Sequence, residues 1–231
     1  KIASLRTEIE QFLFQIRTGR FLEKLSPENQ KSASQRLLAR AQKIYDLLLR
    51  PLEKFSRTKR LVVVPPDFLF YMPFQALHDG RRFLAERREV VYAPSLGVLQ
   101  SCLERKTNSP SRALLAGVSD RAAPLINAEI ETLGKLFKSP VKLKNRAVTV
   151  ENLRAGIEKA DVVHLACHGK FRLDNPDFSA LNLYTENLTV KDVRSLNLRN
   201  KLVVLSACET GLNKIYAGDE LFGLTRGFLN A

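Results

Sequence analysis

Two apolar stretches of the chain end in residues that could carry out nucleophilic chemistry. The stretch DVVHLACHG (161–169) ends on His168 and Gly169, and the stretch LVVLSACETG (202–211) contains Cys208. Each is a short apolar run stopped by polar or glycine residues, which is typical of a buried strand that runs into a turn. A thiolate is a strong nucleophile, and a neighbouring imidazole raises its population and can protonate a leaving amine. The two residues therefore predict thiol chemistry, provided that the fold brings the two strand ends together.

A mostly parallel sheet would bring them together. From Leu61 onward, short apolar runs alternate with amphipathic helical patterns, which predicts an α/β fold with helices on both faces of the sheet. Ligands of such a sheet bind outside the carboxyl ends of its strands, and a right-handed crossover can place two strands side by side. The segment between His168 and Cys208 contains a helix that Thr189 and Asp192 would cap, so it can serve as that crossover. The expected strands are 61–64, 90–93, a run that ends near Gly117, 141–144, 161–169, 181–184 and 201–211.

The residues before this pattern predict a separate helical segment. Apolar residues recur at helical spacing in 4–25 and again in 34–55, which predicts two helices. We therefore expect a helical segment over 1–58 and a sheet domain over 59–231. Because Lys1 already lies inside a helical pattern and is not preceded by Met, we also expect further sequence upstream.

Composition restricts the class of protein. Hydrophobic residues make up 45% of the chain and charged residues 26%, which is ordinary for a globular domain in water. No apolar run approaches the ~20 residues that span a bilayer, and no signal peptide is visible, so we expect no membrane partner. Three cysteines, an odd number, do not make a disulfide framework, which predicts a reducing, cytoplasmic setting.

The formal net charge of +13 raises the question of nucleic-acid binding. The basic residues of the first 60 positions alternate with acidic and apolar ones, which is the pattern of a solvated helix face. Neither a zinc-finger spacing nor an aromatic RNA-binding motif accompanies them. We therefore expect nucleic acid to be a partner only indirectly, if at all, while an acidic protein partner stays an alternative.

Spacing tests other uses of the same residues. A zinc site made of His164, Cys167 and His168 fails, because residues i and i+4 of a strand lie ~13 Å apart. A cysteine phosphatase needs an arginine at the sixth position after its cysteine, and that position after Cys208 is Lys214. A class I amidotransferase places its histidine after its cysteine, whereas no histidine follows Cys208. The order of histidine first and then S-A-C-E-T-G instead parallels the caspase pattern.

The neighbouring residues also have structural interpretations. Cys167 adjoins His168, but adjacent strand residues point to opposite faces, so we expect Cys208 rather than Cys167 to meet the imidazole. His164 lies on the same strand face as His168, and we interpret it as a core or supporting histidine whose polar atoms are satisfied. Core packing alone remains the alternative for each cysteine.

Longer stretches resemble one family. The stretch HLACHGKFRLDNPDFSALNLY (164–184), the stretch LVVLSACETGLNKIYAGDELFGLTRGFLNA (202–231) and the Pro-Phe-x-Ala-Leu-His run at 73–78 are similar to the CHAT family of caspase-like peptidases, which are often fused to tetratricopeptide repeats. The resemblance covers roughly Leu61 to Ala231. Domains of that family continue beyond a helix like the one that ends this chain, so we expect a truncation at Ala231.

The resemblance implies a cysteine endopeptidase that works without a cofactor. His168 would be the general base and acid and Cys208 the nucleophile that forms a thioester, while the backbone N–H groups of Gly169 and Cys208 would make the oxyanion hole. The implied substrate is a protein or peptide. The implied regulator is an upstream tetratricopeptide repeat domain or a regulatory protein, which would give the chain a role in signalling.

The resemblance also gives a substrate cleft. The segment Asp174-Asn175-Pro176 would border it, and Ser206 stands where related peptidases that cleave after basic residues carry Asp. Asp120 is then the remaining acidic candidate for binding a basic P1 side chain, and its alternative role is to cap the turn that follows its strand.

Two other functions stay open. A catalytically silent peptidase-fold module could bind protein partners in signalling without turnover. A basic module that binds nucleic acid would require a contiguous positive surface.

Overall fold

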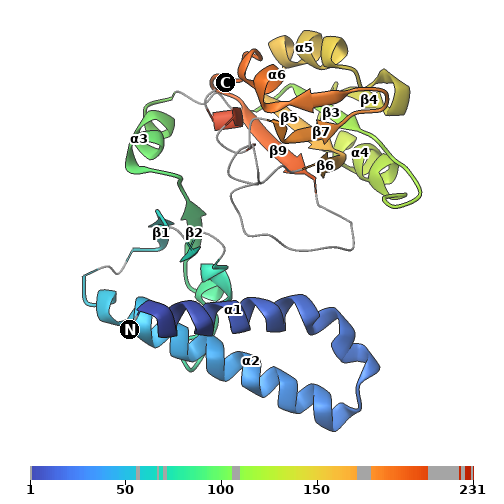
Figure 1. The fold of residues 1–231 in the computed structure, drawn as a ribbon. Coiled ribbons are helices and arrows are strands. Elements are labelled where there is room, and N and C mark those ends of the chain that lie inside the picture. The colour runs from blue at the N-terminus through green and yellow to red at the C-terminus, as the bar shows by residue number, and fades with distance from the viewer. Residues whose placement is uncertain are drawn as a thin grey trace. The chain divides into compact units, whose positions relative to one another are not determined.

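The computed structural model describes residues 2–55, 58–66, 68–69, 72–105, 110–170, 178–207, 224, 227–229 and 231. Contacts between residues divide the chain into two compact units, Lys1–Leu96 and Gly97–Ala231 (Figure 1). The domain boundary expected between residues 58 and 59 stays a prediction.

The first unit begins with two long helices. Helix α1 (Ile2–Thr18) is joined by the 3₁₀ helix η1 (Gly19–Lys24) to helix α2 (Pro27–Leu48), which confirms the predicted N-terminal helices. The side chain of Ser26 accepts a hydrogen bond from the Asn29 N–H, and Pro27 occupies the first helical position. Both features are typical of a helix start and account for the start of α2 at this point. The remaining elements of this unit are η2 (Arg50–Leu52), β1 (Arg60–Val63), η4 (Phe74–Ala76), η5 (Leu84–Glu86) and β2 (Glu89–Tyr92).

The Pro-Phe-x-Ala-Leu-His run is a packing motif of this unit. Phe74 and Leu77 are buried in one hydrophobic cluster with side chains of α1 and α2, and the strands β1 and β2 pair in parallel beside it. His78 Nδ1 accepts the Gly80 N–H at 3.0 Å, and Gly80 has the positive φ of +102° that glycine adopts without strain. The motif therefore stabilises a turn and a core. The buried members of the cluster are Ile9, Phe12, Ala41, Ile44, Tyr45, Leu49, Met72, Phe74, Leu77 and Leu84.

The second unit is built on a parallel sheet with strand order β4-β3-β5-β9 (Figure 1). Its strands are β3 (Ala113–Gly117), β4 (Val141–Lys144), β5 (Val162–Ala166) and β9 (Leu202–Ser206), and its helices are α3 (Leu96–Glu104), α4 (Ile126–Gly134), the 3₁₀ helix η6 (Asn145–Ala147), α5 (Val150–Lys159) and α6 (Val190–Arg194). A four-stranded parallel sheet flanked by helices confirms the predicted α/β class. The cap expected from Thr189 and Asp192 is present as a capping box at the start of α6, and at the start of α5 the Thr149 side chain accepts the Asn152 N–H.

A small antiparallel sheet follows β5. The segment expected as one strand over 161–169 is divided, because β5 ends at Ala166 and a new strand, β6 (His168–Lys170), begins two residues later. Strand β6 pairs with β7 (Ala180–Asn182), which pairs with β8 (Asn187–Thr189). His168 therefore begins an antiparallel strand just beyond the parallel sheet.

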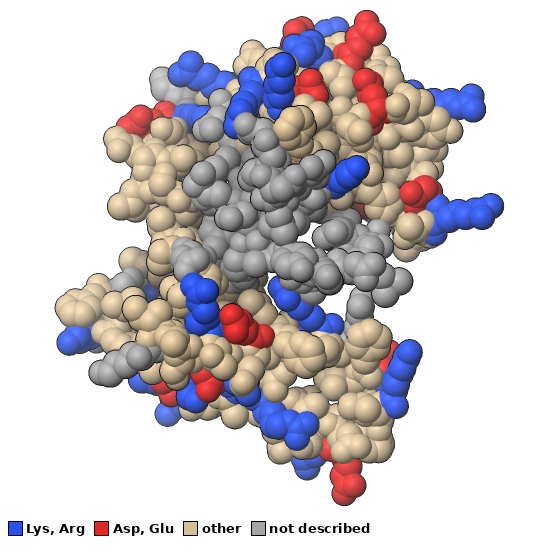
Figure 2. Space-filling view, in the orientation of Figure 1, with Lys and Arg blue, Asp and Glu red and all other residues tan. Residues whose placement is uncertain are grey.

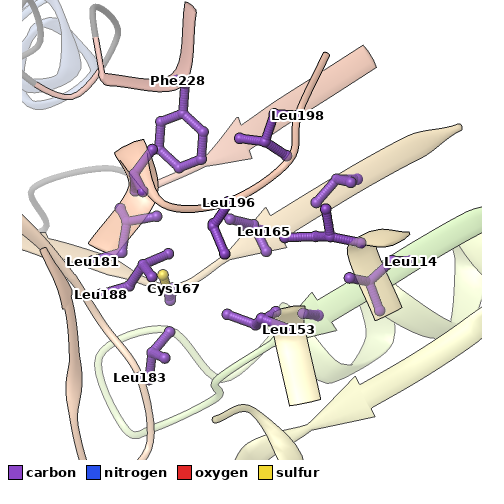
Figure 3. Close-up of a cluster of buried hydrophobic side chains, with 14 of the residues drawn as sticks. Leu114, Leu153, Leu165, Cys167, Leu181, Leu183, Leu188, Leu196, Leu198 and Phe228 are labelled. Atoms are coloured by element: carbon purple, nitrogen blue, oxygen red, sulfur yellow. The ribbon is translucent and has the colours of Figure 1, made fainter. Parts of the chain in front are cut away.

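The central strand β5 is buried on both faces. Val163 and Leu165 join a cluster with side chains of α5 and α6, which Figure 3 shows together with Leu153 and Cys167. Val162 and Ala166 join a second cluster with Ile126 and Ile130 of α4. Alternate residues of the strand thus pack against opposite helix layers, as a parallel sheet covered on both sides requires.

The contact between β3 and α4 can be tested at two glycines. A Cβ added to Gly117 would lie 2.7 Å from side-chain atoms of both Ile126 and Ile130, whereas a Cβ added to Gly134 would meet only the flexible end of Lys142. We expect Gly117→Ala to lower the free energy of unfolding by about 1–3 kcal/mol, because the helix must move away from the strand. We expect Gly134→Ala, the matched control, to leave it unchanged or raise it by up to ~1 kcal/mol through helix propensity. Urea unfolding of both variants measures the difference, and equal effects would contradict this packing.

Candidate functional site

The carboxyl ends of three neighbouring strands meet at one edge of the parallel sheet. Gly117 of β3 pairs with Ala166 of β5, and Ala166 pairs with Ser206 of β9. This confirms that the strands preceding the two predicted reactive residues are adjacent. In the sequence His168 follows Ala166 by two residues, and Asp120 follows Gly117 by three.

Asp120 and His168 contact each other at this edge. The His168 Nε2 atom lies 3.0 Å from Asp120 Oδ2 and 3.1 Å from Asp120 Oδ1. The hydrogen bond from His168, together with the N–H groups of Ala123 and Ala122, holds the pKa of the Asp120 carboxyl below its ordinary value. Because an ionised carboxylate only accepts hydrogen bonds, Nε2 is the donor. The two side chains are 23% and 51% exposed for His168 and Asp120, so solvent and ligands can reach the pair.

Asp120 also organises the turn that follows β3. Its Oδ1 atom accepts the backbone N–H groups of Ala122 and Ala123, each at 2.9 Å. The turn-capping interpretation of Asp120 is therefore confirmed, while selection of a basic P1 residue stays a prediction. The contact with His168 was not expected from the sequence. The available signal was that both residues directly follow neighbouring buried strands and so reach the same edge.

The other predicted site residues are placed as follows. Gly169 lies in β6 and is paired with Leu181 of β7, while Ser206 is the last residue of β9 and is partly buried. The Ser206 carbonyl accepts the Cys167 N–H at 3.3 Å, which continues the ladder between the two strands.

The remaining predicted site residues, Cys208, Asp174 and Asn175, lie outside the described residues. Of the predicted site residues that the structure describes, Asp120 and His168 contact each other at the end of β5 beside β9. The functional roles given to the seven site residues stay predictions.

Cys167 is a core residue. It is 5% exposed and lies among Leu181, Leu183 and Leu188 in Figure 3. Burial raises the pKa of its thiol to about 12, so almost none of it is thiolate near neutral pH. As the alternation of strand side chains predicts, Cys167 faces the hydrophobic cluster of α5 and α6 and cannot act as a nucleophile there.

His164 is a satisfied core residue, as expected. Its Nε2 atom lies 2.8 Å from Glu129 Oε1 of helix α4, and its ring is buried. Cys167 packs on the opposite helix layer, so these two side chains do not converge on one ion. In the described part of the chain no three metal-binding side chains come together.

Charged side chains of both signs share the surface. On the face shown in Figure 2, Lys and Arg side chains stand among Asp and Glu side chains. Several form ion pairs, including Arg40 with Glu8 at 2.6 Å, Arg60 with Glu89 at 2.8 Å and Lys142 with Glu131 at 2.6 Å. Such pairs are typical of solvated faces and give no support to a nucleic-acid interface. None of the helices in the described ranges has the length and apolar character that crossing a membrane requires.

The sequence matches a known family over most of its length. A family model described as the CHAT domain matches residues 38–231. The match includes the strands β3, β5 and β9 and all the predicted site residues. No match is found among curated proteins.

The core position of Cys167 predicts its reactivity. In the folded protein near neutral pH we expect iodoacetamide to leave Cys167 unmodified, because the reagent needs an accessible thiolate. In urea the same thiol should react at the rate of an ordinary cysteine. Cys167→Ala should cost roughly 1–2 kcal/mol of stability through lost packing. Peptide mapping by mass spectrometry measures the modification, and rapid labelling of Cys167 in the native protein would contradict the assignment to the core.

Proposed function

The chain belongs to the CHAT family, whose domain has a caspase-like peptidase fold, and we propose that it is a cysteine endopeptidase acting through a thioester. The observation that carries this proposal is the parallel pairing of β5 with β9, in which Ala166 stands opposite Ser206. In the sequence His168 and Cys208 each follow one of these paired residues by two positions. An imidazole and a thiol that follow adjacent parallel strands are suitably placed to work on one peptide bond.

The proposed reaction uses residues of this chain alone. His168 takes the proton of the Cys208 thiol, and the thiolate attacks the carbonyl carbon of the scissile peptide bond. The backbone N–H groups of Gly169 and Cys208 stabilise the oxyanion of the tetrahedral intermediate. His168 then gives its proton to the leaving amine, so that the peptide bond breaks and a thioester remains. Water, deprotonated by His168, hydrolyses the thioester and restores the thiol.

The substrate in this proposal is a protein or peptide in an extended conformation. Asp174 and Asn175 would border its cleft, and Ser206 at the end of β9 would lie near the P1 side chain. Asp120 is a weaker candidate for selecting a basic P1 residue than the sequence suggests, because its carboxylate already accepts hydrogen bonds from His168, Ala122 and Ala123.

We also propose that a regulatory protein or an upstream tetratricopeptide repeat domain controls the activity in the cytoplasm. The support comes from the first unit, where an apolar groove of about 290 Å³ lies at the η1 end of the two helices. Its lining includes Phe21, Leu22, Leu25 and Leu37, and Phe21 is 48% exposed. An exposed apolar groove of this kind is suited to packing against another protein. It would also serve the alternative function, a silent protein-interaction module.

Chemical labelling and cleavage separate these functions. Near neutral pH an electrophile such as iodoacetamide should label Cys208 first, because imidazole assistance raises its thiolate population. In a peptide-library assay Cys208→Ala and His168→Ala should each abolish cleavage, and combining them should add little, because residues that act as a unit are non-additive.

The matched control is Cys167→Ala, which removes the neighbouring thiol and should leave turnover largely intact. Labelling of Cys167 with Cys208 untouched would exclude the proposed nucleophile. Absence of both Cys208 labelling and cleavage would favour the silent interaction module instead.

A further inference from the structure

Hydrogen bonds hold the Asp120 carboxylate and its turn in place at the edge of the sheet. The Ser119 N–H donates to Asn145 Oδ1 at 3.0 Å, which ties this turn to the loop after β4. Within the turn, the Ser119 hydroxyl lies 3.2 Å from the carbonyl oxygens of both Ala123 and Pro124 and shares its one proton between them. The N–H of Val118 donates to the carbonyl of Ala166 at 2.9 Å, which extends the ladder from β3 to β5 up to this turn.

His168 is fixed from the other side. Its backbone is paired with Asn182 at the start of the antiparallel sheet. Two separately anchored segments thus present an aspartate and a histidine to each other at 3.0 Å, and neither side chain has to be ordered by a ligand before they meet.

The charge of this carboxylate determines where the imidazole carries its proton. A neutral imidazole has one N–H, and the nitrogen without it is the base. Since the ionised Asp120 can only accept, the proton of a neutral His168 belongs on Nε2. The nitrogen that exchanges a proton with a substrate or nucleophile is then Nδ1.

We propose that Asp120 is a positioning residue that holds His168 with its proton on Nε2 and thereby makes Nδ1 the base for the thiol. This role rests on the proposed peptidase function. The contact between Asp120 and His168 is observed in the structure whatever the function is. Asp120 itself touches neither substrate nor thiol in this role. It stabilises the imidazolium that forms during each transfer and prevents the ring from turning.

The hydrogen bonds of Asp120 make asparagine an informative substitution. Oδ1 accepts two backbone N–H groups, from Ala122 and Ala123. In Asp120→Asn the amide would keep its single oxygen toward those two donors, because turning it would lose both bonds for the sake of one. Its NH₂ group would then donate to His168 Nε2 and favour the ring with its proton on Nδ1. A protonated Nδ1 has no free lone pair and cannot accept the proton of the thiol.

The possible roles of Asp120 therefore predict different results. If Asp120 only caps its turn, Asp120→Asn is mild and Asp120→Ala is worse, because asparagine is also favoured in such turns. If it selects a basic P1 residue, both variants lose activity on basic peptides alone. If it positions His168, Asp120→Asn loses activity on every peptide and is at least as damaging as Asp120→Ala, in which water can take the place of the carboxylate.

The experiment combines kinetics with the spectrum of the imidazole. In the full chain we expect Asp120→Asn to lower kcat/KM roughly 100-fold or more on basic and neutral peptides alike. In a Cys208→Ala background at alkaline pH, ¹⁵N spectra of the rings should show His168 protonated on Nε2, and Asp120→Asn should move the proton to Nδ1. The chain has three histidines, so His168→Gln assigns the signal.

Asp161→Asn is the matched control. The Asp161 carboxylate also accepts two backbone N–H groups, from Ser111 and Arg112, but it precedes β5 at the end of the strand remote from His168. We expect this variant to change neither the His168 spectrum nor turnover.

Three results would overturn the proposal: near-normal turnover of Asp120→Asn, a loss confined to basic peptides, or an unchanged Nε2–H signal in Asp120→Asn. If the unsubstituted chain cleaves no peptide, the peptidase function fails by itself, and the spectra still show whether Asp120 sets the proton on His168.

Discussion

The parallel pairing of β5 between β3 and β9 is the constraint on which the site depends. The strand is buried on both faces, with Val163 and Leu165 packed toward α5 and α6 and Val162 and Ala166 packed toward α4. A shift of the register by one residue would exchange these two sets and bury the wrong side chains, so the packing fixes the register. In this register Ala166 lies opposite Gly117 of β3 and Ser206 of β9. The residues that follow these three therefore emerge from the same edge of the sheet.

The same alternation gives two consecutive residues, Cys167 and His168, opposite environments. Cys167 is directed into the apolar cluster, where burial raises the pKa of its thiol to about 12. His168 begins the next strand at the edge of the sheet, where it meets a carboxylate and remains accessible. The core that stabilises the second unit therefore also keeps the Cys167 thiol unreactive, while the His168 imidazole lies outside that core at the end of the strand. In the proposed function, His168 therefore accepts its proton from the thiol of Cys208 and not from that of Cys167.

The sequence predicts the parts of this structure that come from periodicity and capping. Apolar runs mark β3, β5 and β9, and Thr149 and Thr189 mark the starts of α5 and α6. The division of 161–169 into β5 and β6 was not predicted, because a strand of three residues such as β6 has too few residues to show a period. The contact between Asp120 and His168 depends on the path of the turn after β3, which hydrogen bonds of Ser119 and Asn145 determine and no repeating pattern encodes. The strand neighbours could therefore be inferred from the sequence, whereas the side-chain pair could not.

The most direct measurement is a crystal structure of the chain after reaction with a peptidyl acyloxymethyl ketone, which alkylates the nucleophile of a cysteine peptidase. We expect the reagent carbon on Cys208 Sγ, with Nδ1 as the nearer ring nitrogen of His168 and Nε2 still bonded to Asp120. Alkylation of Cys102 or Cys167 with Cys208 unmodified, or a His168 ring turned so that Nδ1 faces Asp120, would contradict the site described above.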